Sequence, residues 1–282
     1  MKVYPFWDSI GRSMMHSSPD PYLLAKTDSY LLVYKPPGLS TAPLFANEQN
    51  TLVHWIVSRF PEIGRVEGRK PIEGGLLHRL DSDTNGLVLF ARNQAAYDNL
   101  IIQQAMGQFV KFYRAWCTNM EDGGNEGGVG FPQLTGKPDL LLQTPLEISS
   151  AFRPYGPGRR QVRPVIIPLN EGPHRRNKEM ALDRGKPYKT TVLSIRRAPD
   201  EQSIYQIDVS IERGFRHQIR CHLAWLGFPI VGDFLYNPLC SSGSCGKEIL
   251  ALQAWAVEFQ DPDTDKRVRY ELSSSTESGG IV

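Results

Sequence analysis

The order of the apolar segments is the feature that most constrains the fold of this chain. Short β-prone runs recur at residues 29–35, 86–91, 109–117, 188–195 and 250–259. Residues 203–211 alternate between apolar and polar side chains, as in a half-buried strand. Apolar residues at helical spacing are confined to residues 51–60, 93–105 and 217–227. Without regular strand–helix alternation or repeats, this order predicts an α+β fold with a mixed, largely antiparallel β-sheet core and flanking helices.

The length and composition are those of an ordinary globular protein. The chain has 282 residues, of which 40% are hydrophobic and 22% charged, enough to bury a substantial core. It contains no apolar run of the roughly 18 residues that a membrane-spanning helix needs. Its first residues lack the basic start and continuous apolar stretch of a secretory signal. We therefore expect a cytoplasmic monomer that has no membrane partner.

The cysteines indicate neither a disulfide framework nor a strong metal site. They are scattered along the chain at Cys117, Cys221, Cys240 and Cys245, so we expect reduced thiols. The spacing of the last two could close around zinc, but only His222 is near in sequence as a further ligand. A plain loop is the alternative, and we expect no metal ion.

Positive charge is concentrated between residues 153 and 189. This segment has ten Lys and Arg residues against three Asp and Glu, whereas the whole chain has a net charge of only +2. Its many prolines suit an extended arm that could lie along phosphates, and a solvated loop is the alternative. The wider Pro- and Gly-rich stretch at about 119–187 predicts an insertion in a catalytic domain at 29–282, which follows an N-terminal extension at 1–28.

Residues 77–92, LHRLDSDTNGLVLFAR, join an acidic turn to an apolar strand. The spacing of Asp81, Asp83 and Asn85 matches the first half of a calcium-binding EF-hand loop. However, Arg92 occupies the position where such a loop needs a bidentate Glu. An aspartic protease would need a second Asp-Thr/Ser-Gly element, and the sequence has none. These observations disfavour a calcium site and a protease.

A solvated turn remains possible, because Asp and Asn favour turns. The neighbouring sequence argues for a different role of Asp81, which follows a His-Arg-Leu tripeptide and precedes a predicted buried strand. A carboxylate at the edge of a sheet needs a cationic partner. The best candidate for this partner lies in the polar cluster at residues 213–222, at the start of a predicted helix. An arginine of this cluster could donate two parallel hydrogen bonds to a carboxylate.

Three ordered motifs carry a specific resemblance. Residues 78–91 match the pattern HRLDxxTSGLLLxA at nearly every position, and residues 111–115 match Lys-x-Tyr-x-Ala. Residues 214–236 resemble GRTHQIRxHLxxLGxPIxGDxLY, although Phe215 and Arg216 replace Arg and Thr. These motifs identify the chain as similar to the RluA-type RNA pseudouridine synthase family. Weaker similarities are the Lys-Pro-Pro-Gly sequence at 35–38 and the Leu-Gln-Ala sequence at 252–254.

The resemblance implies a pseudouridine synthase fold and the isomerisation of uridines in ribosomal or transfer RNA, without a cofactor. It implies that Asp81 is the nucleophile, that Arg220 is its ion-pair partner and that Tyr113 holds the uracil and removes the C5 proton. It further implies that Arg79 fills the gap left by a flipped base. The other expected substrate-binding residues are His78, His217, Gln218 and Leu252.

Alternatives to these assignments stay open from the sequence. Tyr113 and Leu252 would also suit an ordinary core. An RNA-binding protein without catalysis, or an enzyme that releases free uracil, would use many of the same residues. The sequence does not identify which RNA or which uridine is modified.

Overall fold

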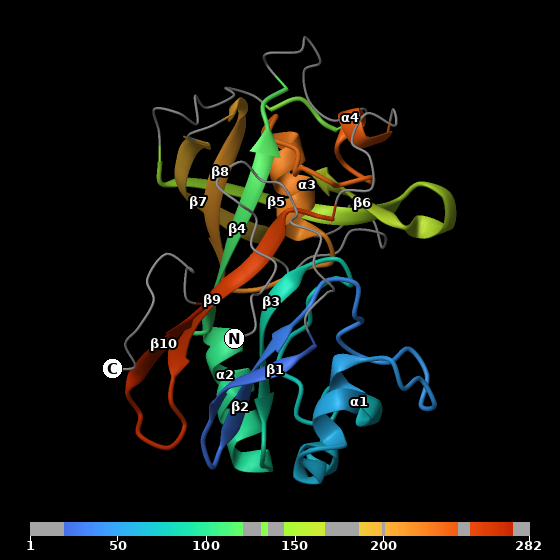
Figure 1. The fold of residues 1–282 in the computed structure, drawn as a ribbon. Helices are drawn as coiled ribbons and strands as arrows, with labels where there is room; N and C mark the ends of the chain where they lie inside the picture. The colour runs from blue at the N-terminus through green and yellow to red at the C-terminus, as the bar shows by residue number, and fades with distance from the viewer. Residues whose placement is uncertain are drawn as a thin grey trace, which may run out of the picture. The chain divides into compact units, whose positions relative to one another are not determined.

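The computed structural model describes residues 20–120, 131–134, 144–166, 186–198, 201–241 and 249–272. They fall into two compact units, whose elements are labelled in Figure 1. The first unit draws mainly on Arg12–Lys111 and Gln253–Val282, and the second mainly on Phe112–Leu252. The chain passes between the units within strand β4 (Val110–Thr118) and at the start of strand β9 (Leu252–Gln260).

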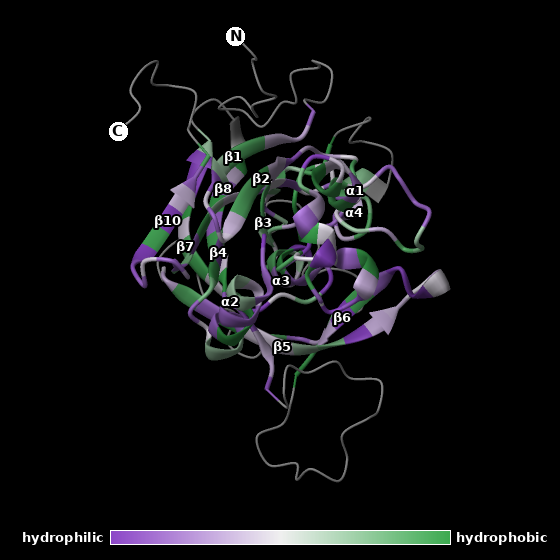
Figure 2. Cartoon of the chain, turned by 90° about the horizontal axis from the view of Figure 1, so that it is seen from below, coloured by the Kyte–Doolittle hydropathy of each residue, from purple (hydrophilic) through white to green (hydrophobic). Residues whose placement is uncertain are grey.

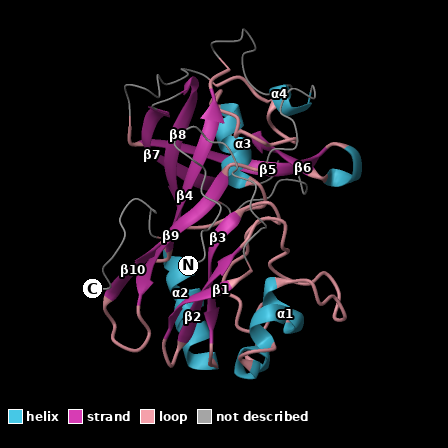
Figure 3. Ribbon diagram, viewed as in Figure 1, coloured by secondary structure: helices cyan, strands magenta, loops and turns pink. Residues whose placement is uncertain are grey.

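The first unit is built on a mixed sheet. Its strands are β1 (Tyr22–Lys26), β2 (Tyr30–Lys35), β3 (Asn85–Ala91), β9 and β10 (Arg267–Glu271). Strand β2 pairs antiparallel with β1 and with β3, and β10 pairs antiparallel with β9. Strand β3 runs parallel to the beginning of β9. Figure 3 shows these strands in magenta.

The helices of the first unit begin where the sequence predicts. Helix α1 (Leu52–Val57) is capped by Thr51, and α2 (Gln94–Met106) by Asn93, because each cap side chain accepts a hydrogen bond from a first-turn N–H. Helix α2 ends at Gly107, which adopts the left-handed conformation common at helix ends. Two short 3₁₀ helices follow α1 in the chain: η1 (Pro61–Arg65) and η2 (Pro71–Glu73).

Among its described residues, the second unit contains four strands besides its part of β4. They are β5 (Leu146–Tyr155), β6 (Gln161–Val165), β7 (Tyr188–Ala198) and β8 (Glu201–Ile211). Antiparallel pairs join β6 to β5, β5 to β7 and β7 to β8. The helices described in this unit are η4 (Pro157–Arg159), α3 (Gln218–Trp225) and α4 (Pro238–Ser241).

Part of the expected insertion at 119–187 is therefore regular structure. Strands β5 and β6 form a hairpin within it, joined through η4. Figure 2 shows this hairpin mainly in purple and pale colours, in keeping with its arginines, prolines and glycines. The division into an extension at 1–28 and a catalytic domain at 29–282 stays a prediction.

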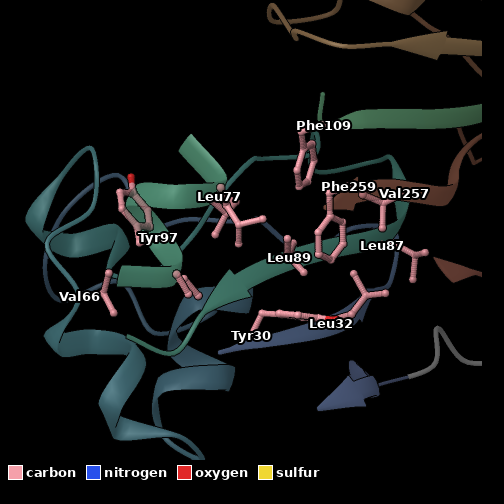
Figure 4. Close-up of a cluster of buried hydrophobic side chains, with 13 residues drawn as sticks. Tyr30, Leu32, Val66, Leu77, Leu87, Leu89, Tyr97, Phe109, Val257 and Phe259 are labelled. Carbon is pink, nitrogen blue, oxygen red and sulfur yellow. The ribbon is translucent and has the colours of Figure 1, made fainter. Parts of the chain in front are cut away.

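A buried cluster in the first unit fixes strand β3, whose seven residues are all buried. Figure 4 shows Leu87 and Leu89 of β3 beside Leu32 of β2 and Phe259 of β9. Helix α2 adds Tyr97 to the same cluster. Each buried leucine contributes about 1.5–3 kcal/mol relative to an exposed one. The strand that follows the acidic turn is therefore held firmly in place.

Within the described ranges, no helix is long and apolar enough to span a membrane.

Candidate active site

The acidic turn presents Asp81 just before β3. Asp81 is half-buried, whereas Ser82 and Asp83 are exposed. The backbone N–H of Thr84 donates to the carbonyl of Asp81 at 3.1 Å and closes the turn. The expected placement of Asp81 beside a buried strand is therefore observed. None of the described residues forms a group of three or more His, Cys, Asp or Glu that could hold a metal ion.

Asn85 and Gly86 hold the end of this turn in place. The amide of buried Asn85 donates to the hydroxyl of Tyr34 at 3.1 Å. Gly86 has φ of +130°, and a Cβ added there would lie 2.2 Å from the carbonyl oxygen of Ala254. Only glycine allows β3 and β9 to approach this closely.

Lys35 anchors the turn from the end of β2. Its buried Nζ donates to three carbonyl oxygens, of Pro36 at 2.8 Å, Leu39 at 2.7 Å and Ser82 at 2.8 Å. The N–H of Gly38 donates to the same Ser82 oxygen at 2.9 Å. Burial lowers the pKa of Lys35 to about 7 against the opposing effect of nearby carboxylates. Sequence reasoning missed this contact, and the only signal was the Lys-Pro-Pro-Gly sequence after a buried strand.

His78 joins the segment before Asp81 to β3. Its Nε2 accepts a hydrogen bond from the N–H of Leu89 at 3.3 Å, and its ring packs against Phe109. Burial lowers the pKa of His78 well below its usual value, and the charges of Lys111 and Arg69 act in the same direction. His78 is therefore neutral at neutral pH. Its Nδ1 has no hydrogen-bond partner among the described residues.

Arg79 projects its side chain towards solvent, with 58% of it exposed. Its Nη1 lies 3.5 Å from Oε1 of Glu73, whose side chain is only 7% exposed. Lys70 lies 3.7 Å from the same oxygen. Ion pairs with such exposed cations are weak, so Arg79 can exchange this contact for another anion. Glu73 was not among the residues singled out from the sequence.

Tyr113 and Arg220 belong to the second unit. Tyr113 is buried on β4. Arg220 lies on α3 and forms a two-pronged ion pair with Asp233, with distances of 2.7 Å for both Nε–Oδ2 and Nη2–Oδ1. Sequence analysis missed Asp233, although its Gly-Asp dipeptide belongs to the third motif. The expected pairing of Arg220 with Asp81 joins residues of different units and stays a prediction.

His217 and Gln218 open helix α3. His217 has φ of +56°, and its Nδ1 lies 3.1 Å from the hydroxyl of Tyr236. The amide of buried Gln218 donates to Lys189 O at 2.8 Å and to Thr190 Oγ1 at 3.0 Å. These hydrogen bonds connect the first turn of α3 to strand β7. The substrate-binding roles of both residues stay predictions.

Leu252 is buried at the start of β9, with 3% of its surface exposed. This burial suits either the core or a pocket wall, so its expected contact with uracil also stays a prediction.

A buried polar network holds the second histidine of the third motif. The ring nitrogens of His222 lie 2.9 Å from Ser150 Oγ and 2.8 Å from Thr190 Oγ1. These contacts join α3 to β5 and β7. Burial lowers the pKa of His222 from 6.5 to about 3.

We expect the free energy of unfolding to fall as the pH is lowered from 6.5 towards 3. The fold keeps His222 neutral, whereas the unfolded chain binds a proton near pH 6.5, so protons favour the unfolded state across this window. The slope for this histidine should reach about 1.4 kcal/mol per pH unit. Urea unfolding of wild-type protein and His222→Asn between pH 7.5 and 5 measures it, with exposed His54→Asn as the control. Equal slopes in wild type and His222→Asn would contradict this expectation.

The described cysteines divide into two kinds. Cys117 and Cys221 are buried free thiols, and burial raises the pKa of each. Cys240 is disulfide-bonded. The expectation of reduced thiols is therefore wrong for Cys240, because the spacing of cysteines along the chain does not show which of them meet in the folded protein. Cys245, which was also considered as a zinc ligand, lies outside the described residues.

Comparison with known proteins identifies a family for most of the chain. The family model described as RNA pseudouridylate synthase matches residues 29–225. An "Uncharacterized RNA pseudouridine synthase" of Chloroflexus aurantiacus is 29% identical over 205 residues, which is 72% of this chain and 51% of that protein. "Ribosomal large subunit pseudouridine synthase D" of Neisseria meningitidis is 26% identical over 259 residues, which is 88% of this chain and 57% of that protein. The chain thus spans little more than half the length of these relatives.

Two solved human structures share the fold. RNA Pseudouridylate Synthase Domain Containing 1 has a TM-score of 0.60 at 17% identity, covering 92% of this chain and 86% of the other. Domain Containing 4 has a TM-score of 0.54 at 17% identity, covering 90% of this chain and 88% of the other. The predicted α+β pseudouridine synthase fold is confirmed.

Proposed function

The chain belongs to the RNA pseudouridylate synthase family, and we propose that it isomerises uridines in RNA to pseudouridine. The observation that carries this proposal is the family match over residues 29–225, which includes Asp81, Tyr113 and Arg220. The half-buried Asp81 on a firmly anchored turn suits a carboxylate that must reach one atom of a bound nucleotide.

In the proposed reaction, the carboxylate of Asp81 attacks C1′ of the target uridine. The N1–C1′ bond breaks with its electron pair on the uracil, which turns and forms a new bond to C1′ through C5, releasing Asp81. Tyr113 removes the C5 proton, and N1 gains a proton, so the product is an isomer of the substrate. No electrons are gained or lost, and the step requires no redox cofactor.

The remaining roles come from the motif resemblance. By this resemblance, Arg220 is assigned as the ion-pair partner of Asp81. Arg79 enters the space left by the flipped base, for which its exposed side chain and weak ion pair suit it. Further substrate contacts are assigned to His78, His217, Gln218 and Leu252. We place the reaction in the cytoplasm and assign it to a monomer.

The β5–β6 hairpin is our candidate for phosphate contacts. Residues 151–166 contain no acidic side chain, and Arg153, Arg159 and Arg160 are exposed. Arg153 lies opposite Arg163 in the strand register. Like charges in this arrangement repel, and an RNA phosphate between them would relieve the repulsion.

We expect the double variant Arg153→Gln/Arg160→Gln to bind RNA more weakly and with a smaller dependence on salt. Removing one arginine–phosphate interaction should reduce the slope of log Kd against log salt by roughly 0.7–0.9. The matched control is Arg59→Gln/Arg65→Gln, which removes two exposed arginines of the first unit. Filter binding over a range of salt concentrations measures both slopes, and equal slopes in the two variants would argue against the hairpin.

The activity itself is tested with RNA carrying tritium at C5 of uridine. Pseudouridine formation releases the tritium and leaves the chain length unchanged. Free uracil would indicate hydrolysis, and tight binding without either product would indicate an RNA-binding protein. Since the Neisseria meningitidis relative is called a ribosomal large subunit pseudouridine synthase, large-subunit ribosomal RNA is the first substrate to test and transfer RNA the second.

A further inference from the structure

The basic β5–β6 hairpin is attached to helix α3 and to the segment that follows it, all within the second unit. Strand β6 stands last in the order of its sheet, and β5 is the one described strand that pairs with it. The N–H of Val162 in β6 donates to the hydroxyl of Tyr236 at 2.8 Å. The carbonyl of Val162 accepts a hydrogen bond from the thiol of Cys221 on α3 at 3.6 Å. Side chains in and after α3 therefore bind β6 to the body of this unit.

Arg216, just before α3, contacts the tip of the hairpin. Its Nη2 donates to the carbonyl oxygens of Arg159 at 2.7 Å and Gln161 at 3.3 Å. Arg159 has φ of +55°, a left-handed conformation that costs free energy in a residue other than glycine. Hydrogen bonds from a charged guanidinium offset this cost, because they are stronger than those from a neutral donor. Arg216 thus stabilises the conformation of the tip from outside the hairpin.

Phe215 contacts the same hairpin through strand β5. Its ring is stacked on that of Phe152, with centroids 5.2 Å apart and an interplanar angle of 6°. The ring of Tyr188 in β7 lies beside it, with centroids 5.0 Å apart. Aromatic pairs in such arrangements contribute more than their buried area alone. Phe215 and Arg216 are also the two positions at which the third motif departs from the family pattern, so both departures contact the hairpin.

The charges of the hairpin oppose its closure. Arg153 lies opposite Arg163 in the strand register, Arg159 and Arg160 follow at the tip, and residues 151–166 contain no acidic side chain. Like charges directly opposite each other destabilise a strand pair. Contacts from outside the hairpin can hold these arginines in one arrangement before RNA binds. A surface that is ordered in advance binds its partner with a smaller loss of conformational entropy.

We propose that Phe215 and Arg216 are positioning residues that hold the basic β5–β6 hairpin in its RNA-binding conformation. This inference rests on the proposed function, in which the hairpin contacts RNA phosphates. Both residues act through the hairpin, and neither serves as a phosphate ligand in this scheme. Because α3 carries Gln218 and Arg220, the same contacts fix the phosphate-binding surface relative to this helix.

The first test is hydrogen–deuterium exchange of the protein without RNA. Arg216→Gln and Phe215→Leu should each raise the exchange of amides in β5 and β6, including that of Val162, and leave the amides between β7 and β8 as in the wild type. The control is Arg197→Gln, which removes an exposed arginine of the same unit that donates to the hydroxyl of Tyr205. It should leave the hairpin amides unchanged. Wild-type exchange of the hairpin in both test variants would overturn the proposal.

The second test separates positioning from direct phosphate contact. Filter binding to an unmodified transcript of large-subunit ribosomal RNA should give a Kd raised roughly 2- to 10-fold in Arg216→Gln and in Phe215→Leu, the contribution of one typical hydrogen bond. The slope of log Kd against log salt should keep its wild-type value. A slope reduced by roughly 0.7–0.9 in Arg216→Gln would show that Arg216 binds phosphate itself, contrary to a positioning role. An equal rise in Kd for Arg197→Gln would also overturn the proposal.

A mutant cycle connects Arg216 to the arginines of the hairpin. When Arg153→Gln/Arg160→Gln is already present, adding Arg216→Gln should raise Kd less than it does in the wild type, because the hairpin that Arg216 holds has lost those charges. Additive effects would contradict the proposal. Tritium release tests the proposed function separately. A wild-type protein that releases no tritium, but shows the expected exchange and binding results, would overturn the isomerase and leave the positioning role standing.

Discussion

Asp81→Asn should abolish pseudouridine formation while leaving RNA affinity close to that of the wild type. An amide cannot attack C1′ as a carboxylate does, and loss of a nucleophile reduces turnover by at least roughly 10⁴-fold. The fold should tolerate the change, because the residue is half-buried and closes the turn through its backbone carbonyl. Tritium release from C5-labelled RNA measures the rate, and filter binding measures the affinity.

The control for this result is Asp83→Asn. Asp83 belongs to the same turn, is exposed and loses the same charge on substitution. Its variant should retain turnover within a few-fold of wild type, because no step of the proposed reaction uses it. Turnover that survives in Asp81→Asn, or falls equally in both variants, would contradict Asp81 as the nucleophile.

Lys35→Met should both destabilise the protein and slow the reaction. Methionine fills a similar volume but removes the donor shared by three carbonyl groups, two of which belong to the loop after β2 and one to Ser82. The Pro36 and Leu39 oxygens lose their donor at a cost of about 1–3 kcal/mol each, whereas the Ser82 oxygen keeps its bond from the N–H of Gly38. Methionine removes the desolvation cost of the buried ammonium, so the free energy of unfolding should fall by less than this sum, about 1 kcal/mol or more. Loss of the anchor at Ser82 should also move Asp81 and reduce the single-turnover rate.

The control for Lys35→Met is Lys26→Met, the same substitution at an exposed lysine of the neighbouring strand β1. Lys26 is exposed and lies 5.1 Å from the centre of the Phe60 ring, so its loss should change the free energy of unfolding little. Urea unfolding and single-turnover assays compare the two variants. If Lys35→Met unfolds at the same urea concentration as Lys26→Met, the three carbonyl contacts do not stabilise the turn.

Much of the fold could be predicted because apolar spacing determines it locally. The buried strands β2 and β3 and the capped helix α2 were expected at nearly their observed bounds. Strands β1 and β10 were missed because they contain no fully buried residue, and so lack the apolar pattern of an inner strand. Strands β5 and β6 were hidden by the prolines and arginines of the basic segment.

Part of the candidate site could also be predicted from the sequence, and part could not. The turn at Asp81 could be predicted because its residues are contiguous. Lys35 contacts Ser82 across 47 residues and Asp233 contacts Arg220 across 13, and no local pattern reports such contacts. These two contacts can be identified only from the tertiary structure, which shows the groups that bind each buried charge.

The parallel pairing of β3 with β9 has a consequence for synthesis of the chain. Gly86 meets Ala254, and Val257 and Phe259 complete the cluster that holds β3. A nascent chain that ends before residue 253 has already produced the acidic turn, but lacks the strand against which the turn is packed. The ribosome must therefore synthesise nearly the whole described chain before the unit that contains Asp81 can fold completely.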